Sequence, residues 1–324
     1  MPAKSSRAAP WLSVVMPTHL GGEWFGATLD SLAGQSDRDF ECLIIDSSPN
    51  GEALALARPY ADRLNFREFR RPDLEHWRSK TNFGFQEARA DFVSMLHQDD
   101  VWRPGRAAAL RGWIAAAPDM TMHLHPTDII DGRGERLGTL RCPWPADGAP
   151  LASDRLLESL LVQNFISVPT PAIRRDAFLA VGGIDEALWY TGDWDLYLKL
   201  ARHGPFAYHA QALSGFRIHG QSLTVSGSRD PAAFESQMRG VLATHIQAVS
   251  PSRREPVLRV ADASIAVNTR LAAAMNGDRA AANLAAAAGT ALGLGPAMLY
   301  DYLRNSRLAE RFSPRLRARL AGGL

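Results

Sequence analysis

Two neighbouring carboxylates follow directly on an apolar segment. The run Asp91-Phe-Val-Ser-Met-Leu96 leads into His97-Gln98-Asp99-Asp100. Adjacent carboxylates repel each other unless a cation or hydrogen-bond donors offset their charge. Hard divalent cations such as Mg²⁺ and Mn²⁺ take oxygen ligands of this kind and share them with the phosphate oxygens of a ligand. The pair therefore indicates either a metal site or two carboxylates that cap the helix expected after Pro104.

Polar residues also end the two strands predicted upstream. The buried-strand pattern Trp11-Leu-Ser-Val-Val-Met-Pro17 runs into Thr18, and Phe40-Glu-Cys-Leu-Ile-Ile-Asp46 ends at a carboxylate. Strands that alternate with helices of 10 to 15 residues predict a mostly parallel α/β sheet. Ligands bind beyond the carboxyl ends of the strands in such sheets, so these residues mark one candidate site. Neither G-x-G-x-x-G nor G-x-x-x-x-G-K-[ST] occurs, and both motifs would supply phosphate-binding glycines.

Composition limits the class of protein. The 324 residues carry 36 Lys and Arg against 34 Asp and Glu, and 46% of them are hydrophobic. These values exclude a disordered chain, and the absence of a long basic run argues against nucleic-acid binding. Cys42 and Cys142 form no disulfide framework, which favours a cytoplasmic location. We expect a disordered N-terminus over residues 1–10, a catalytic domain over 11–230 and a helical region over 231–324.

Six segments, in order, resemble the family 2 glycosyltransferases with the GT-A fold. This fold is a mixed, mostly parallel sheet flanked by helices, here with a C-terminal α-helical extension. Each segment is weakly specific alone, but their order is informative. They are Val-Val-Met-Pro17-Thr18-His19, Leu-Ile-Ile-Asp46-Ser47-Ser48, Lys80-Thr-Asn82-Phe-Gly84 with the run from Ala88 to Asp100, Ile173 through Gly183 to Glu186, Thr191-Gly-Asp193-Trp194-Asp195, and Phe216-Arg217-Ile-His219 through Thr224.

The resemblance implies a site for a nucleotide-diphosphate sugar. Backbone groups of Pro17 and Thr18 would frame the base and ribose, and Asp46 would accept a hydrogen bond from the base. Lys80 would lie near the base or the diphosphate. His97 stands where the family often has an aspartate. We expect its imidazole to lie beside the sugar donor, where it would form a hydrogen bond with a hydroxyl.

The resemblance also implies the metal ligands and the base. Asp99 would bind Mg²⁺ or Mn²⁺, with Asp100 in support and His219 as a second ligand or a diphosphate contact. Asp193 would be the general base that takes the proton of the acceptor hydroxyl. Asp195, on another face of the same predicted helix, is the second candidate. Asp193 is also well placed to be the N-cap of that helix.

Aromatic residues beside Asp193 are candidates for the acceptor side. Trp189 and Tyr190 precede it and Trp194 follows it, and aromatic rings stack well on sugars, although the same rings would suit the core. Ser47 stands where the family often has a second aspartate. Gly192 stands where glutamate often precedes the base, which suggests an altered donor or acceptor.

The C-terminal region has two unusual segments. Residues 280–300 carry no charge, but Gly293-Leu-Gly295-Pro296 should divide them into two helices. Residues 303–319 are rich in arginine. Two interpretations stay open: peripheral contact with the inner face of a membrane, or a helical bundle that packs on the catalytic domain or forms a homodimer.

The sequence thus predicts an inverting, metal-dependent glycosyltransferase that moves a sugar from a nucleotide-diphosphate donor to a glycan, polysaccharide or lipid-linked acceptor. Two alternatives stay open. A nucleotidyltransferase would also bind a nucleotide over an α/β sheet, but it would release pyrophosphate. A non-catalytic nucleotide- or glycan-binding protein would bind the ligand without needing Asp193.

Overall fold

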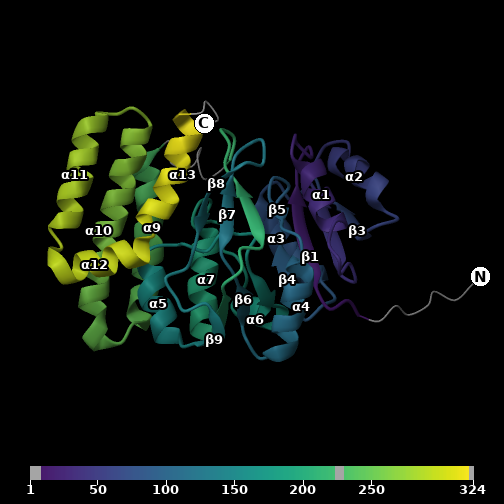
Figure 1. The fold of residues 1–324 in the computed structure, drawn as a ribbon, viewed down its shortest axis with the longest axis horizontal. Helices are drawn as coiled ribbons and strands as arrows, with labels where there is room; N and C mark the ends of the chain where they lie inside the picture. The colour runs from purple at the N-terminus through teal and green to yellow at the C-terminus, as the bar shows by residue number, and fades with distance from the viewer. Residues whose placement is uncertain (1–8, 223–229, 321–324) are drawn as a thin grey trace, which may run out of the picture.

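The computed structural model describes residues 9–222 and 230–320, and a central eight-stranded sheet runs through its first two thirds (Figure 1). Of these strands, β10 and β9 run opposite to the other six, so the sheet is mixed and mostly parallel. In sheet order the strands are β3 (Asn65–Arg70), β2 (Glu41–Asp46), β1 (Ser13–Thr18), β4 (Phe92–Met95), β10 (Ala172–Arg174), β6 (Met122–Leu124), β11 (Phe206–His209) and β9 (Asp147–Leu151).

The order β3-β2-β1-β4 contains a switch in direction. From β1 the chain proceeds outward to β2 and β3, then returns to place β4 on the other side of β1. Loops that leave β1 and β4 therefore diverge, and they open a crevice at the carboxyl ends of these strands. A second sheet lies beside it, in the order β5 (Val101–Trp102), β12 (Ser214–Arg217), β7 (Thr127–Ile130) and β8 (Arg136–Leu140).

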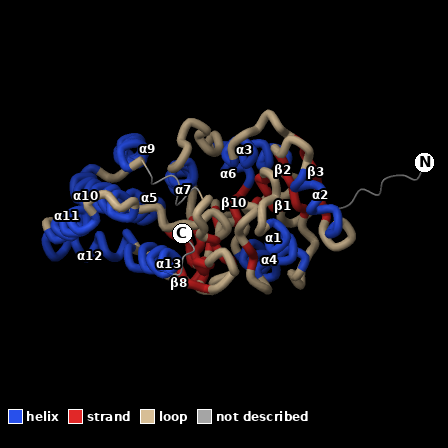
Figure 2. Tube along the Cα trace, turned by 90° about the horizontal axis from the view of Figure 1, so that it is seen from above, coloured by secondary structure: helices blue, strands red, loops and turns tan. Residues whose placement is uncertain are grey.

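Alternation along the strands divides the core into two layers, because successive side chains of a strand point to opposite faces. Val14 and Met16 belong to the layer under α1 (Phe25–Ala33), α2 (Glu52–Ala57) and α4 (Arg106–Ala116). Val15 belongs to the layer under α3 (Trp77–Glu87), α5 (Ser153–Val162), α6 (Arg175–Ala180) and α7 (Gly192–His203). Figure 2 shows α1 and α4 on one side of the strands and α3, α6 and α7 on the other.

Two local features set how helices meet the sheet. Gly84 in α3 lies against β1, and a Cβ at this position would overlap the Val15 side chain. The helix expected from Pro104 begins at Arg106, because Gly105 adopts a left-handed conformation with φ of 81° before it. Helix α2 is followed directly by a short 3₁₀ helix, η1 (Arg58–Tyr60).

The C-terminal region is helical. Its elements are α9 (Pro231–His245), η2 (Ile246–Ala248), α10 (Pro251–Met275), α11 (Ala280–Leu292), α12 (Gly295–Ser306) and α13 (Leu308–Leu320). Asp230 caps α9 by accepting hydrogen bonds from the amides of Ala232 and Ala233. In Figure 1, α10 and α11 stand side by side at the end far from β1, and α13 returns to β8.

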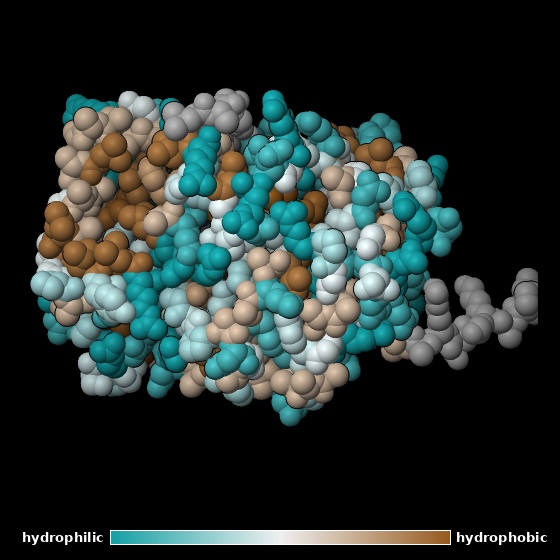
Figure 3. Space-filling view, in the orientation of Figure 1, coloured by the Kyte–Doolittle hydropathy of each residue, from teal (hydrophilic) through white to brown (hydrophobic). Residues whose placement is uncertain are grey.

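The uncharged segment divides where the glycines and proline predict. Helices α11 and α12 meet at an angle of 116°. Among the described residues no single helix has the length and apolarity to cross a membrane, and only this bent pair meets the criterion jointly. Figure 3 shows apolar side chains gathered over α10 to α12, where Leu292, Tyr300 and Leu303 are exposed. Residues 1–8 of the N-terminus expected to be disordered lie outside the described ranges. Leu223 and Thr224 of the sixth segment lie outside them too.

Candidate active site

The ends of β1 and β2 lie side by side. Thr18 pairs with Asp46 in the parallel register, so both residues reach the same edge of the sheet. Asp46 is fully buried, and its Oδ1 accepts hydrogen bonds from the backbone amide and the hydroxyl of Ser48. Its Oδ2 is buried with no hydrogen-bond partner in the described part of the chain. One carboxylate oxygen is thus unpaired, but it is also shielded from solvent.

Lys80 reaches this edge from α3. Its Nζ donates to the Thr18 carbonyl and to the Ser47 hydroxyl, both at 2.8 Å. Burial of the ammonium lowers the pKa of Lys80 to about 8, and the charge of Asp46 offsets part of that effect. Ser47, which replaces the second aspartate common in the family, therefore serves as a neutral acceptor for this lysine.

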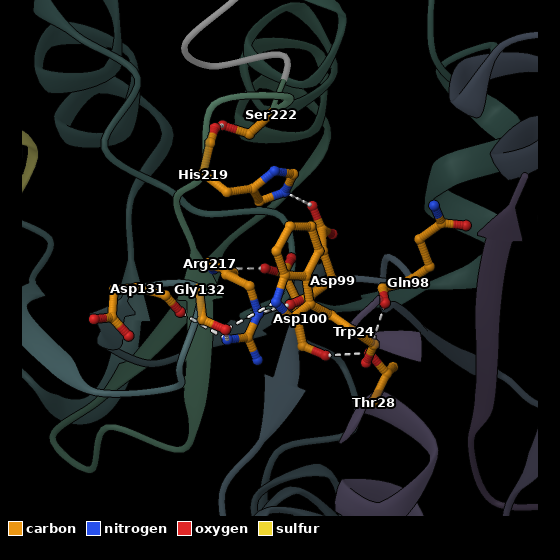
Figure 4. A network of polar contacts seen from close by, with 10 residues as sticks. All are labelled: Trp24, Thr28, Gln98, Asp99, Asp100, Asp131, Gly132, Arg217, His219 and Ser222. Carbon is orange, nitrogen blue, oxygen red and sulfur yellow. Dashed lines mark hydrogen bonds and ion pairs between the residues drawn. The ribbon is translucent and has the colours of Figure 1, made fainter. Parts of the chain in front are cut away.

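The acidic pair lies in the turn after β4. The Asp100 amide donates to the His97 carbonyl at 3.2 Å, which closes the turn. Asp99 Oδ2 lies 3.0 Å from His219 Nε2, and Asp100 Oδ1 accepts a hydrogen bond from the Arg217 amide at 2.9 Å (Figure 4). These two contacts join the turn after β4 to the end of β12 and the segment that follows it, about 120 positions later in the sequence.

Backbone contacts around Arg217 hold the turn in place. The Arg217 guanidinium donates to the carbonyls of Asp99, Asp131 and Gly132. The hydroxyl of Thr28 in α1 donates to the Gln98 and Asp100 carbonyls, each at 2.9 Å. These bonds use backbone oxygens, so they occupy none of the carboxylate oxygens of the turn (Figure 4).

The two carboxylates differ in their electrostatics. Burial, with the neighbouring charge of Asp99, raises the pKa of Asp100 well above its ordinary value. Burial opposes ionisation of Asp99 too, yet the hydrogen bond with His219 lowers the pKa of Asp99 below its ordinary value. Asp100 Oδ2 is buried and has no hydrogen-bond partner among the described residues. A cation beside it would offset the cost of its charge.

The side chains at this turn are suitable ligands for a divalent cation. Ligand atoms of His97, Asp99 and Asp100 all lie within 4.8 Å of one another. Two carboxylates with an imidazole are typical ligands of Mn²⁺ and, for the oxygens, of Mg²⁺. His97, expected on the donor side, thus joins the group, while His219 is not a member of it and contacts Asp99 directly. The His219 ring stacks on Trp24 with centroids 4.1 Å apart.

Asp193 lies in the first turn of α7. The N-cap of this helix is Thr191, so Asp193 does not have the capping role that its position also allowed. Its Oδ2 accepts from Asn164 Nδ2 at 3.0 Å and its Oδ1 from the Trp194 amide at 2.9 Å. Burial raises the pKa of Asp193 to about 6, against the opposing effect of these hydrogen bonds. The carboxylate is ionised at neutral pH, yet it is a much stronger base than an exposed aspartate.

Asp195 is placed very differently. Its carboxylate pairs with His245 of α9 at 2.8 Å and with Lys199 at 2.6 Å. Burial opposes its ionisation, but the hydrogen bonds from His245 and Lys199 lower the pKa of Asp195 below its ordinary value. These contacts tie α7 to α9, and Asp195 does not line the cavity that Asp193 faces.

The three aromatic residues expected on the acceptor side do not all line the same cavity. Tyr190 and Trp194 line the cavity around Asp193, while Trp189 does not. Trp194 is anchored by a 2.7 Å hydrogen bond from its indole to the Leu160 carbonyl. Gly192 has little room for the larger residue that the family often has there, because a Cβ would lie 3.0 Å from Ile184.

Two cavities meet at the acidic turn. The strand-end cavity is lined by Pro17, Thr18, Trp24, Lys80 and His219, among others, whereas the predicted base contact Asp46 is fully buried and does not line it. The Asp193 cavity runs from Asp99 and Asp100 past Asn164 to α10 and α13. Both are lined by Trp77, His97, Asp99 and Ser222. A ligand in one cavity can therefore react with a ligand in the other beside Asp99.

Several residues of the Asp193 cavity were not expected from the sequence. Asn164 holds the carboxylate, Asn268 comes from α10, and Arg311 and Arg315 come from α13. The sequence predicts for the arginine-rich segment either membrane contact or packing in a helical bundle, and neither interpretation places its arginines in the site. The spacing of four between Arg311 and Arg315 is the one signal that places both on a single helix face.

Comparisons with known proteins agree on the class. A model of glycosyl transferase family 2 matches residues 13–178, about half of the chain. RP339 of Rickettsia prowazekii, an uncharacterized glycosyltransferase, is 24% identical over 246 residues, 74% of each chain. An uncharacterized glycosyltransferase of Rickettsia felis is 23% identical over 215 residues, 65% of this chain and 35% of that longer protein. The chain belongs to glycosyl transferase family 2.

Solved structures extend the likeness of fold beyond the family match. TarS 1-349 of S. aureus superposes with a TM-score of 0.60 at 17% identity, over 96% of this chain and 91% of that one. The mannosyltransferase PcManGT of Pyrobaculum calidifontis, in complex with GDP-Man and Mn²⁺, gives a TM-score of 0.55 at 16% identity, over 95% and 87%. These are GT-A glycosyltransferases, and the expected GT-A fold is confirmed.

Proposed function

We propose that this glycosyltransferase is metal-dependent and inverting, and that it transfers a sugar from a nucleotide-diphosphate donor to a hydroxyl of a glycan or lipid-linked acceptor. The observation that carries the proposal is the junction of the two cavities at Asp99, with Asp193 in one and Lys80 in the other. The proposed catalytic domain is residues 11–230, and the helices of 231–324 complete the acceptor side.

The donor is assigned to the strand-end cavity. Pro17 and Thr18 line this cavity, and Asp46 is the proposed acceptor for a base N–H, although its unpaired Oδ2 is buried and must be uncovered for that contact. Lys80 offers an ammonium to the diphosphate, and it already holds the loop through Thr18 and Ser47. The neighbouring structures of TarS with UDP-GlcNAc and of PcManGT with GDP-Man support a nucleotide-sugar donor.

The metal is assigned to Asp99 and Asp100. His97 is a third ligand close by, and His219 lies beside Asp99. Bound there, Mg²⁺ or Mn²⁺ would supply Lewis-acid stabilisation for the negative charge that grows on the leaving diphosphate. Burial lowers the pKa of His97, so its imidazole stays neutral and can act as a ligand. The Mn²⁺ in the PcManGT complex supports this assignment.

The acceptor hydroxyl is assigned to the Asp193 cavity. As its oxygen bonds to the anomeric carbon of the sugar, its proton passes to Asp193, and the bond from that carbon to the diphosphate breaks. A base with a pKa of about 6 is ionised at pH 7 and strong enough to assist this transfer. Asn164 orients the carboxylate by its hydrogen bond to Oδ2. One displacement of this kind inverts the anomeric configuration.

The test is a donor panel with product analysis. UDP-, dTDP- and GDP-sugars are incubated with the enzyme, Mn²⁺ and glycan acceptors, and both the nucleotide product and the anomeric configuration are determined. Release of a nucleoside diphosphate with inversion supports the proposal, and loss of transfer in Asp193→Asn assigns the base. Release of pyrophosphate would instead favour a nucleotidyltransferase. Donor binding without any turnover would favour a non-catalytic binding protein.

A further inference from the structure

Helix α13 brings two arginines into the Asp193 cavity. The helix is fixed along β8: Glu310 accepts a hydrogen bond from the Arg141 amide at 2.8 Å, and Arg317 donates to the Leu137 carbonyl at 2.8 Å. Pro314 packs against Gly138, where a Cβ would lie only 2.9 Å from the proline ring. Arg311 and Arg315 line the cavity from this anchored helix, which lies between α9 and β8 in Figure 1.

Neither guanidinium has a carboxylate partner among the residues that the structure describes. Arg311 donates to two uncharged oxygens, the Ser306 carbonyl and Asn268 Oδ1, each at 3.0 Å. No described acidic group forms an ion pair with Arg315. Burial, together with the charge of Arg315, lowers the pKa of Arg311 to about 10. Two like charges face one cavity without a counter-ion, and a bound anion would relieve that cost.

Negative and positive side chains lie in different parts of the Asp193 cavity. Asp99 and Asp100 form one end, while Arg311 and Arg315 form part of the wall built by the C-terminal helices. An anionic molecule would be repelled from the acidic end unless a metal covers it, and would be attracted to the arginines. Guanidinium groups bind phosphate and carboxylate oxygens through paired hydrogen bonds. Such a molecule would lie with its anion on α13 and the rest directed toward Asp193.

We propose that the acceptor carries a phosphate or carboxylate group, which Arg311 and Arg315 bind while its hydroxyl faces Asp193. This inference rests on the proposed function, since it names the class of acceptor for the same cavity. It gives the arginine-rich α13 a role in substrate selection.

The first test uses inorganic phosphate and acetate as probes. Binding to the full chain is measured by calorimetry at constant ionic strength, in EDTA, for wild type, Arg311→Ala, Arg315→Ala and Arg259→Ala. Arg259 is the control, because it is an exposed arginine of α10 that does not line the cavity and does not anchor α13. We expect about 10-fold or greater weakening for Arg311→Ala and Arg315→Ala and no change for Arg259→Ala. Equal binding by all four proteins would overturn the proposal.

The second test uses pairs of sugar acceptors that differ only in one phosphate or one carboxylate. We expect wild type to prefer the acidic member, and Arg315→Ala to lose that preference through KM with the donor KM unchanged. The phosphate and carboxylate pairs identify which anion is bound. If Arg315→Ala weakens binding of UDP or GDP with Mn²⁺ instead, the arginines serve the donor and the proposal is wrong.

Two controls separate the possible failures. Arg315→Lys keeps the charge and the packing, and it should recover part of the phosphate binding if Arg315→Ala is poorly folded, as judged by thermal unfolding. Release of a nucleoside diphosphate from a nucleotide sugar by wild type with Mn²⁺ tests the proposed function separately. Failure of the acceptor proposal would leave that release intact, whereas failure of the proposed function would abolish it.

Discussion

Replacing Asp193 by asparagine should abolish transfer and at the same time stabilise the fold. Burial raises the pKa of this carboxyl to about 6, whereas an unfolded aspartate has a pKa of about 3.9. The folded state therefore holds the proton more tightly. Each pKa unit corresponds to about 1.4 kcal/mol, so ionised Asp193 costs up to about 3 kcal/mol of folding free energy above pH 6.

The pH dependence of this cost provides an internal control. Below pH 3.9 the carboxyl is protonated in both states and the cost is absent; it grows as the pH rises and is complete above pH 6. Asparagine is isosteric and uncharged but keeps only one of the two acceptor oxygens, so Asp193→Asn should raise the unfolding midpoint by at most a few degrees at pH 7.5 and should not raise it at pH 4. Transfer at pH 7.5 should fall by about 10²- to 10⁴-fold.

Asp195→Asn is the matched variant, two positions along the same helix. Asp195 is held by His245 and Lys199, so losing its charge should destabilise the protein by about 1.5–3 kcal/mol. Denaturant unfolding of both variants, with transfer assays on the same samples, gives the comparison. The reasoning is refuted if Asp193→Asn destabilises at pH 7.5, or if its gain in stability is the same at pH 4.

Three further predictions follow from the same structure. The value of kcat/KM should be bell-shaped with pH, rising through about 6 as Asp193 ionises and falling through about 8 as Lys80 loses its proton; a flat profile would contradict both roles. Lys80→Met should weaken nucleoside-diphosphate binding by about 10-fold or more in titration calorimetry, and unchanged affinity would remove it from the donor site. Gly84→Ala should destabilise by about 1–3 kcal/mol in denaturant unfolding, because its Cβ overlaps Val15. Gly112→Ala, in α4 with nothing within 4 Å of its Cβ, should stabilise by about 0.5–1 kcal/mol, and equal effects would show that packing on β1 is not responsible.

The sequence predicted the strands well where their signals are local. Apolar runs that end in Thr18, Asp46 and the acidic pair became β1, β2 and β4, since buried parallel strands need continuous apolar residues. The helix break at Gly293 to Pro296 was equally readable, because the local backbone chemistry determines it. Helix starts were less predictable, as the left-handed Gly105 before α4 shows.

The site was harder to predict, because it depends on contacts between distant segments. The resemblance ranks Asp193 before Asp195, and the contacts with Asn164 and His245 give the physical difference between them. His97 enters the metal group because the turn after β4 brings it to the carboxylates, which spacing alone does not specify. Arg311 reaches the cavity through the return of α13 to β8, a feature of tertiary packing.

The central claim is that Asp99 supports metal-dependent transfer from a nucleotide sugar. The most direct measurement is nucleoside-diphosphate release from a panel of UDP-, dTDP- and GDP-sugars, by wild type and Asp99→Ala, with Mn²⁺ and with EDTA. We predict that at least one donor is consumed by wild type with Mn²⁺, and that EDTA or Asp99→Ala lowers the rate by about 100-fold or more. Equal rates for Asp99→Ala and wild type with every donor that is consumed would contradict the claim.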